Sequence, residues 1–534
     1  MIRITELPLP LDYTPDSMRR AILQRLALSD GELLDFKLFK RSYDARRKNS
    51  AILFICIVDV AVSDEAAVLR RMANDRQVGP APDTDYHPVA QAPPTLAERP
   101  LVVGFGPCGL FAALLLAQMG FRPIVLERGR EVRRRTQDTW ALWRKHTLTP
   151  ESNVQFGEGG AGLFSDGKLY SQIKDPRFYG RKVMREFVKA GAPEEILFVS
   201  KPHIGTFRLT GVVAAMREEI ISLGGEVRFE SRVTDLLIED AQIEGVQLAS
   251  GEVLRSRHVV LALGHSSRDT LRMLERRRVY LEAKPFAIGF RIEHPQSLID
   301  VARLGRFAGH PDLGSADYKL VHHARNGRAV YSFCMCPGGT VVAATSEPQR
   351  VVTNGMSQYS RNERNANAGI VVAINPEQDY PGGPLAGLAL QESLESTAYV
   401  LGGGDYSAPG QLVGDFLRGR SSTELGDVLP SYQPGVQLGD LSRALPAYAI
   451  DAIREALPAF GQQLRGFDRQ DAVLTGVESR TSSPVRITRD AQTLQSLNVR
   501  GLYPCGEGAG YAGGILSAGV DGIKVAEAVA RSMA

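Results

Sequence analysis

The 534-residue sequence has few cysteines and no long apolar run. Only two of its five cysteines, Cys334 and Cys336, are close together, so a disulfide framework is excluded and a reducing compartment is indicated. No run of about eighteen apolar residues occurs, and residues 1–6 lack a basic segment followed by an apolar core. We therefore expect a cytoplasmic protein without a membrane span.

A strong excess of charge of either sign is also missing. Lys and Arg total 63 against 60 for Asp and Glu, which gives no global argument for nucleic acid or an acidic membrane as a partner. One local basic cluster lies near the N-terminus and could meet phosphates, although a solvated surface is the simpler interpretation. The cluster consists of Lys37, Lys40, Arg41, Arg46, Arg47 and Lys48.

A glycine-rich motif begins near residue 100. Gly104-Phe105-Gly106-Pro107-Cys108-Gly109 follows the apolar run 101–103 and precedes the apolar run 110–119, which predicts a strand, a tight turn and a helix. A second apolar run, 123–126, ends in Glu127, where a dinucleotide ribose needs an acceptor. Gly104 permits the turn, Gly106 lets the backbone approach a pyrophosphate, and Gly109 lets helix and strand pack closely. The sequence therefore predicts a dinucleotide-binding βαβ unit.

Two later segments indicate a flavin dinucleotide. The apolar run 258–263 ends at Gly264 and is predicted to return to the parallel sheet beside the first βαβ unit. Near the C-terminus, a strand ends at Gly506-Glu507 before the helical run 515–534, and Glu507 could accept from ribityl or ribose hydroxyls. The helix start after Gly513-Gly514 could face the flavin pyrimidine. No second glycine fingerprint stands between a strand and a helix, so a dedicated NAD(P) domain is not expected.

These features resemble the glutathione-reductase-like FAD-binding superfamily, in its branch with one nucleotide-binding domain. The likeness to a bacterial family of uncharacterised FAD-dependent dehydrogenases covers nearly the whole chain. The segments that carry it are 156–169 (FGEGGAGLFSDGKL), 201–206 (KPHIGT), 333–339 (FCMCPGG) and 479–486 (SRTSSPVR). The resemblance implies noncovalent FAD and a small α/β module in front, and it leaves the substrate open.

The expected fold class is α/β, with a Rossmann-type FAD-binding domain, an inserted α+β substrate domain and an N-terminal ferredoxin-like module. The predicted divisions are the module at 1–80, a proline-rich linker at 81–98, the FAD-binding domain at 99–279 and 471–534, and the substrate domain at 280–470. The predicted cofactor-binding residues are Gly104, Gly106, Pro107, Cys108, Gly109, Glu127, Arg128, Gly159, Gly160, Ala161, Gly162, Ser165, Asp166, Gly167, Val233, Gly264, Gly506, Glu507, Gly508, Ala509, Gly513, Gly514 and Ile515.

Five residues are candidates for chemistry. Lys168 could place a positive charge near flavin N1 or N5, or lie on the surface. Cys334 and Cys336 could form a redox pair, or serve as structural or substrate-contacting residues, and no metal site is expected. His203 could be a general acid, or a hydrogen-bonded structural histidine. Arg480 could orient a carboxylate or phosphate, or make an ion pair within the fold.

The reaction we expect is hydride transfer between FAD N5 and a small organic substrate, as dehydrogenation or as enone or imine reduction. Electrons would pass to or from transiently bound NAD(P)H, a protein partner, a quinone or oxygen. Two alternatives stay open: a flavoenzyme that modifies RNA, docked through the basic cluster, and a non-enzymatic flavin redox sensor or assembly factor.

Overall fold

The computed structural model describes residues 1–46, 48 and 50–534, so Arg47 of the basic cluster lies outside the described residues. The N-terminal module is a four-stranded antiparallel sheet in the order β2-β3-β1-β4. Its βαββαβ element order is ferredoxin-like, as predicted from the sequence. The elements are β1 Ile2–Pro10, α1 Pro15–Leu26, β2 Leu33–Asp44, β3 Leu53–Val62, α2 Glu65–Arg71 and β4 Val78–Pro80.

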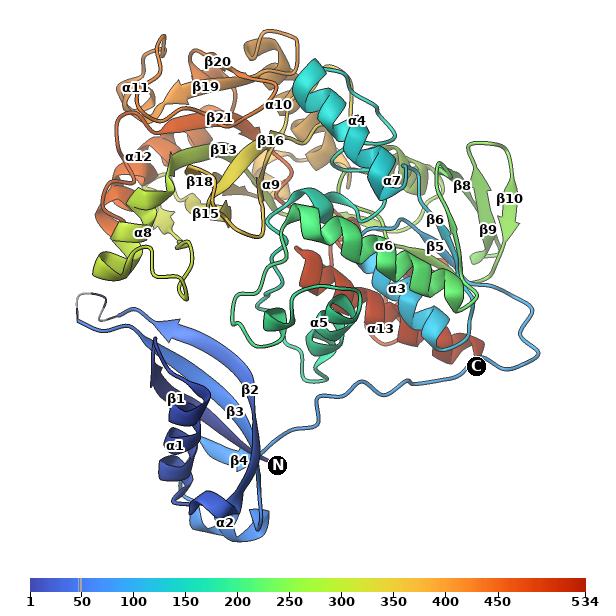
Figure 1. Cartoon of the computed structure of the whole chain (residues 1–534). Coiled ribbons are helices and arrows are strands. Elements are labelled where there is room, and N and C mark those ends of the chain that lie inside the picture. Colours follow the sequence, from blue (N-terminus) through green and yellow to red (C-terminus); the bar gives the residue numbers. More distant parts are fainter. Residues whose placement is uncertain (47, 49) are drawn as a thin grey trace.

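The module has its own core because one face of its sheet and one face of α1 are apolar. Ile22 and Leu26 of α1 are buried together with Val58 and Val60 of β3. Thr14 begins α1 by accepting a hydrogen bond from the backbone N–H of Ser17, the usual way to satisfy a free helix donor. Residues 81–100 contain no helix or strand and run as an extended segment to the main body (Figure 1).

The centre of the main body is a five-stranded parallel sheet in the order β23-β11-β5-β6-β7. The strand β11 pairs directly with β5, as expected of the segment that ends at Gly264. Strands β5, β11 and β23 are buried on both faces, which explains their uninterrupted apolar sequences. The strands are β5 Leu101–Val103, β6 Ile124–Leu126, β7 Glu226–Arg228, β11 Val259–Leu261 and β23 Leu502–Pro504.

Helices cover one face of this sheet, and a three-stranded sheet with α7 covers the other. Val102 and Val125 point to the helical side, whereas Val103 and Leu126 point to the other side. Helix α13 packs along α3, so the C-terminal helix supports the nucleotide motif (Figure 1). The covering elements are α3 Pro107–Gln118, α4 Val132–Lys145, α5 Tyr179–Lys189, α6 Thr206–Ser222, β8 Val233–Glu239, β9 Gln242–Leu248, β10 Val253–Arg255, α7 Arg268–Arg276 and α13 Ile515–Met533.

A second, mixed sheet of seven strands lies beside the first, in the order β14-β15-β18-β13-β21-β19-β20. Its last strand in sequence, β21 Val473–Glu478, lies beyond the predicted boundary at residue 470 because it completes the ladder between β13 and β19. The other strands are β13 Phe286–Pro295, β14 Val321–His323, β15 Ala329–Cys336, β18 Asn365–Ile374, β19 Ala408–Leu412 and β20 Val436–Leu438. Two short pairs accompany it, β12 Leu281–Ala283 with β22 Val485–Ile487 and β16 Gly339–Ala343 with β17 Thr353–Ser357.

Helices close the seven-stranded sheet. Helix α12 packs on β14, β15 and β18 and buries Ile453 and Phe460 in the largest apolar core. The helices of this part are α8 Gln296–Leu304, α9 Pro376–Asp379, α10 Ala386–Leu401, α11 Val413–Arg418 and α12 Ala447–Gln463. Throughout residues 1–46, 48 and 50–534, every helix is either too short or too polar to span a bilayer.

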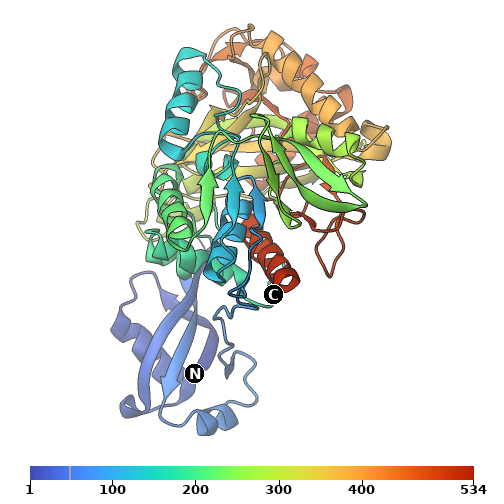
Figure 2. The ribbon, with the colours of Figure 1, turned by 90° about the vertical axis from the view of Figure 1, so that its right-hand side faces the viewer.

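The N-terminal module contacts the main body through the outer edge of β2, and Figure 2 shows it lying at one end of the molecule. The backbone N–H of Ser200 donates to the carbonyl of Arg41 over 2.9 Å, and the Arg41 guanidinium lies 5.6 Å from the Phe198 ring. The Lys48 ammonium donates to the carbonyl of Ala302 in α8. Two members of the predicted basic cluster, Arg41 and Lys48, therefore contact the main body.

Candidate active site

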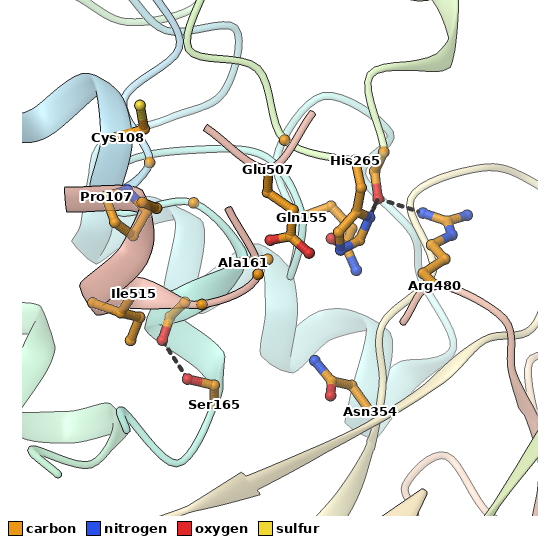
Figure 3. A pocket seen from close by; sticks show the side chains of 18 of the residues that line it. Pro107, Cys108, Gln155, Ala161, Ser165, His265, Asn354, Arg480, Glu507 and Ile515 are labelled. Carbon is orange, nitrogen blue, oxygen red and sulfur yellow. Dashed lines mark hydrogen bonds between the residues drawn. The ribbon is translucent and has the colours of Figure 1, made fainter. Parts of the chain in front are cut away.

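One cavity of about 1000 Å³ runs between the carboxyl ends of the parallel strands and the seven-stranded sheet. Figure 3 shows side chains that line it. In open α/β sheets this crevice is the usual ligand site. The predicted cofactor residues that line it are Gly104, Gly106, Pro107, Cys108, Glu127, Arg128, Gly160, Ala161, Gly162, Ser165, Asp166, Val233, Gly264, Glu507, Gly513, Gly514 and Ile515. The sequence-distant segments of the prediction thus meet at a single cavity.

Two helices begin at the cavity without a side-chain cap. Helix α3 begins after Gly106 and α13 after Gly514, and no side chain accepts from the first N–H groups of either helix. Such N-termini bind phosphate through free donors and the helix dipole. The residues at both helix starts line the cavity, so they fit a dinucleotide such as FAD, whose pyrophosphate needs donors at a close backbone approach.

The motif glycines allow α3 to pack directly against the strands. A Cβ at Gly109 would lie 2.0 Å from the carbonyl oxygen of Gly104, closer than atoms in proteins approach. Gly104 has a φ of +100°, and a Cβ there would lie 2.6 Å from the carbonyl oxygen of Ala262. Gly109 does not line the cavity. Gly109 lies behind the cavity wall, where its close packing sets the position of α3.

Five other predicted cofactor residues also lie outside the cavity lining. Gly508 packs against the carbonyls of Leu263 and Gly264, and Gly506 packs against Cys108. Close packing therefore accounts for glycine at positions 506 and 508. The five residues are Gly159, Gly167, Gly506, Gly508 and Ala509.

Glu127 follows β6 at the cavity wall and is 5% exposed. Its carboxylate accepts hydrogen bonds from the backbone N–H groups of Phe105, Gly129 and Gly157, at 2.8–2.9 Å. Because each carboxylate oxygen has two lone pairs, Glu127 can still accept from a ribose hydroxyl. It also ties the glycine motif to the loop that starts at Gly157.

Replacing Glu127 with alanine is expected to reduce FAD retention at least tenfold, because the ribose acceptor and the anchor of two loops are lost together. The flavin-to-protein ratio after gel filtration measures this. Glu151→Ala is the matched control. Glu151 lies near the same wall at a half-exposed position, and its carboxylate forms ion pairs only with arginines. It accepts hydrogen bonds from Arg128 and lies 3.7 Å from Arg232. Stoichiometric flavin in Glu127→Ala would show that the ribose assignment is wrong.

The glycine-rich loop that starts at Gly157 has polar residues both at the cavity and away from it. Ser165, Asp166 and Lys168 line the cavity. Glu158 points away from it and accepts from the N–H of Val132 and from Arg217. The loop passes through the short 3₁₀ helix η2, Ala161–Phe164, whose start packs on Gly106.

Lys168 and Cys334 meet on the far side of the cavity, where β15 ends. The Lys168 ammonium donates to the carbonyl of Met335 and lies 3.8 Å from the Asp166 carboxylate. Asp166 is itself held by Arg361, at 3.0 Å. Although burial opposes its charge, negative charge at Cys334 and at Asp166 raises the pKa of Lys168, so its ammonium stays charged at ordinary pH. Cys334 lines the cavity, while Cys336 is fully buried behind it.

The other two candidates for chemistry, His203 and Arg480, make contacts within the fold. His203 does not line the cavity. Its Nε2 lies 2.9 Å from the carbonyl oxygen of Tyr359, its ring stacks on Tyr359, and burial lowers its pKa to about 4. Arg480 lines the cavity, but its guanidinium donates to Glu395, Ser266 and Ser346, so its ion pairing is within the fold.

Several residues of the cavity lining were not predicted from the sequence. His265, Gln155 and Asn354 line the cavity, and Figure 3 shows them with Glu507. Burial lowers the pKa of His265 to about 3, so its imidazole is neutral, and its Nδ1 lies 3.0 Å from the Ser266 hydroxyl. Burial raises the pKa of Glu507 to about 7. Two of them carried a positional signal in the sequence, since His265 directly follows the apolar segment that ends at Gly264 and Gln155 directly precedes the segment 156–169.

Among the residues that the structure describes, no three His, Cys, Asp or Glu side chains are grouped as metal ligands.

Family models match most of the main body and part of the N-terminal module. One described as FAD-dependent protein, C-terminal domain-like, matches residues 285–481, and one described as FAD dependent oxidoreductase matches residues 199–288. A domain of unknown function matches residues 1–61. A curated protein of Clostridium beijerinckii, described as an uncharacterized protein, is 48% identical over 527 residues, which is 98% of each chain.

Solved structures resemble the chain only weakly. Glycine oxidase from Geobacillus kaustophilus gives a TM-score of 0.36 at 11% identity, over 81% of this chain and 95% of that one. L-proline dehydrogenase from P. horikoshii gives 0.31 at 13% identity, over 82% and 95%. These scores carry no argument about function, and the fold assignment depends on the strand order given above.

Proposed function

The chain belongs to the same uncharacterised bacterial family of FAD-dependent oxidoreductases as its Clostridium beijerinckii relative, and from that premise we propose that it transfers a hydride between N5 of FAD and an organic substrate. FAD is the cofactor, and the protein is an oxidoreductase. The proposed reactions are dehydrogenation and enone or imine reduction.

The proposal rests on the observation that one cavity reaches from the dinucleotide motif to the seven-stranded sheet. The same hollow is lined by the dinucleotide motif at Gly104–Cys108 and by Phe333–Met335 of β15. Bound FAD supplies a centre that accepts or donates a hydride at N5. We propose that residues 99–279 and 479–534 hold FAD and that the seven-stranded sheet part, 280–478, holds the substrate.

Positive charge on the substrate side favours an anionic group on the substrate. That side of the lining carries the cations Lys168, Lys201, Arg303 and Lys319 and the carboxylates of Asp166 and Asp317. Lys201 is paired with Asp317 at 2.6 Å, and Lys319 is exposed. A net positive wall concentrates anionic ligands. We propose a small or medium carboxylate or phosphate substrate.

Lys168 is the residue we assign to stabilising negative charge at the reacting end of the cavity. Its ammonium is oriented by the carbonyl of Met335 and by Asp166, so it needs no rearrangement when charge develops beside it. The Asp166 carboxylate forms an ion pair with both Lys168 and Arg361, which offsets the repulsion between these two cations. The cation is therefore preorganised for this role.

Lys168→Met is expected to slow flavin reduction by about 10²–10³-fold and to lower the flavin midpoint potential, because a buried positive charge is removed. Lys168→Arg should restore most of the potential. Lys319→Met is the control, since Lys319 is exposed at the mouth and should change substrate affinity more than potential. An unchanged potential in Lys168→Met would contradict the assigned role.

The electron donor is tested by the anaerobic absorbance spectrum of the purified protein before and after NADH and then NADPH are added. Bleaching of the flavin band supports transient NAD(P)H as the donor. A band unchanged by both nucleotides, but bleached by an anionic organic substrate, supports a dehydrogenase that passes electrons to a protein partner, a quinone or oxygen. Flavin that no anionic substrate and neither nucleotide reduces would contradict the proposed function.

A further inference from the structure

Cys334 and Cys336 stand at a bulge in β15, at the cavity wall. Phe333 lies opposite Gly369 on β18 and Cys336 lies opposite Asn367, so β15 contains one extra residue between these pairs. Cys334 has a φ of +43°, which non-glycine residues rarely adopt. Bulges of this kind re-aim side chains next to active sites. Here the bulge turns Cys334 to the cavity.

Cations hold the backbone of the bulge on both sides. Arg291, which is fully buried, donates to the carbonyl of Cys334 over 2.9 Å and forms an ion pair with Glu478. Lys168 donates to the carbonyl of the next residue, Met335. The Cys336 sulfur also lies 3.4 Å from the Cys334 carbonyl oxygen. The two sulfur atoms are therefore attached to a strongly anchored backbone turn.

The surroundings favour a thiolate at Cys334 and a thiol at Cys336. A hydrogen bond from Cys336 and the charges of Lys168 and Arg291 lower the pKa of Cys334, whereas the same hydrogen bond and burial raise the pKa of Cys336. The carboxylates of Asp166 and Glu478 oppose this effect from the other sides. Cys334, which is only partly buried, is the sulfur that a ligand in the cavity can reach.

We propose that Cys334 and Cys336 form a redox-active dithiol that exchanges two electrons with FAD and connects it to a disulfide or dithiol substrate. On oxidation, a bond forms between the Sγ atoms of the Cys334 thiolate and the Cys336 thiol, and Cys336 loses its proton. The two electrons and that proton pass to FAD. In the reverse direction, reduced FAD returns two electrons and a proton to the Cys334–Cys336 disulfide and regenerates the thiolate and thiol. The Cys334 thiolate then attacks a substrate disulfide and releases the first substrate thiol, and Cys336 attacks the Cys334 sulfur of the mixed disulfide, releases the second substrate thiol and re-forms the Cys334–Cys336 disulfide. The inference uses the FAD cofactor but not the proposed hydride transfer to an organic substrate.

An anaerobic reductive titration of the holoenzyme tests this. The protein is first oxidised with diamide, passed through gel filtration and titrated with dithionite while the flavin band is recorded. The wild type is expected to take up about four electrons per FAD, and Cys334→Ser and Cys336→Ser about two. Cys56→Ser, a buried cysteine of the N-terminal module, should behave as the wild type.

Peptide mapping locates the bond independently of the flavin. After diamide treatment, the unreduced tryptic peptide of residues 329–350 should be lighter by two hydrogen atoms and should resist alkylation, and both properties should revert after the titration. A wild type that takes up about two electrons, with both cysteines open to alkylation after diamide, would overturn the proposal. The wild-type count and peptide map decide this even where a variant folds poorly. Neither readout needs an organic substrate, so failure here is distinct from failure of the hydride transfer.

Discussion

Gly109→Ala is expected to reduce FAD retention to less than about a tenth of the parent level, because α3 cannot keep its place once Gly109 carries a side chain. The added Cβ would lie 2.0 Å from the Gly104 carbonyl and 3.2 Å from the Ala262 Cβ, and both belong to the strand ends. The helix must move outward, and its free N–H groups move with it. We expect a loss of stability above about 2 kcal/mol as well.

Gly211→Ala is the matched control for this prediction. Gly211 lies in the exposed face of α6, and a Cβ there meets nothing within 4 Å. Alanine in a helix should raise the stability by about 0.5–1 kcal/mol and leave the flavin content unchanged. Flavin per protein and thermal unfolding measure both variants. Stoichiometric flavin in Gly109→Ala would contradict the close-packed motif described here.

Glu395→Gln is expected to lower the free energy of unfolding by about 3–5 kcal/mol, since it leaves two buried arginines short of a counter-ion. Glu395 on α10 is 0% exposed and accepts from Arg268 at 2.7 Å and from Arg480 at 2.7 and 2.8 Å. These bonds join α10 to α7 and to the segment after β21. The measurement is denaturant unfolding at pH 7.

Glu392→Gln, one turn earlier on α10, is the control. Its partners Arg272 and Arg350 are more accessible, so we expect a loss of at most about 1 kcal/mol. The two arginines hold the pKa of Glu395 well below its usual 4.5. A depressed folded-state pKa gives stability that is present above the unfolded pKa and lost as the pH falls, so the difference between wild type and Glu395→Gln should shrink in acid. A constant difference down to pH 3 would contradict the assignment.

Local patterns in the sequence located segments of the nucleotide motif that line the cavity. The turn at Gly104, the acid Glu127 and the helix start at Gly514 each depend on a few neighbouring residues, and parallel strands bring their carboxyl ends to one edge. The ferredoxin-like module was likewise predictable, since alternating apolar runs in a short segment allow few folds.

The substrate side could not be predicted because it depends on contacts between residues far apart in sequence. Arg480 resembled a ligand-binding arginine, and nothing near it in sequence identified Glu395, 85 residues away, as its partner. The bulge that turns Cys334 to the cavity depends on the register between β15 and β18. The contact between His203 and Tyr359 likewise joins residues far apart in sequence.

The most direct test of the account is the flavin content of the purified protein, measured from its absorbance spectrum and again after denaturation and filtration. We predict one FAD per chain, released into the filtrate on denaturation and replaced stoichiometrically when FAD is added to the stripped protein. A chain that folds without flavin and binds none when FAD is added would contradict the assignment of the cavity, and with it the proposed hydride transfer.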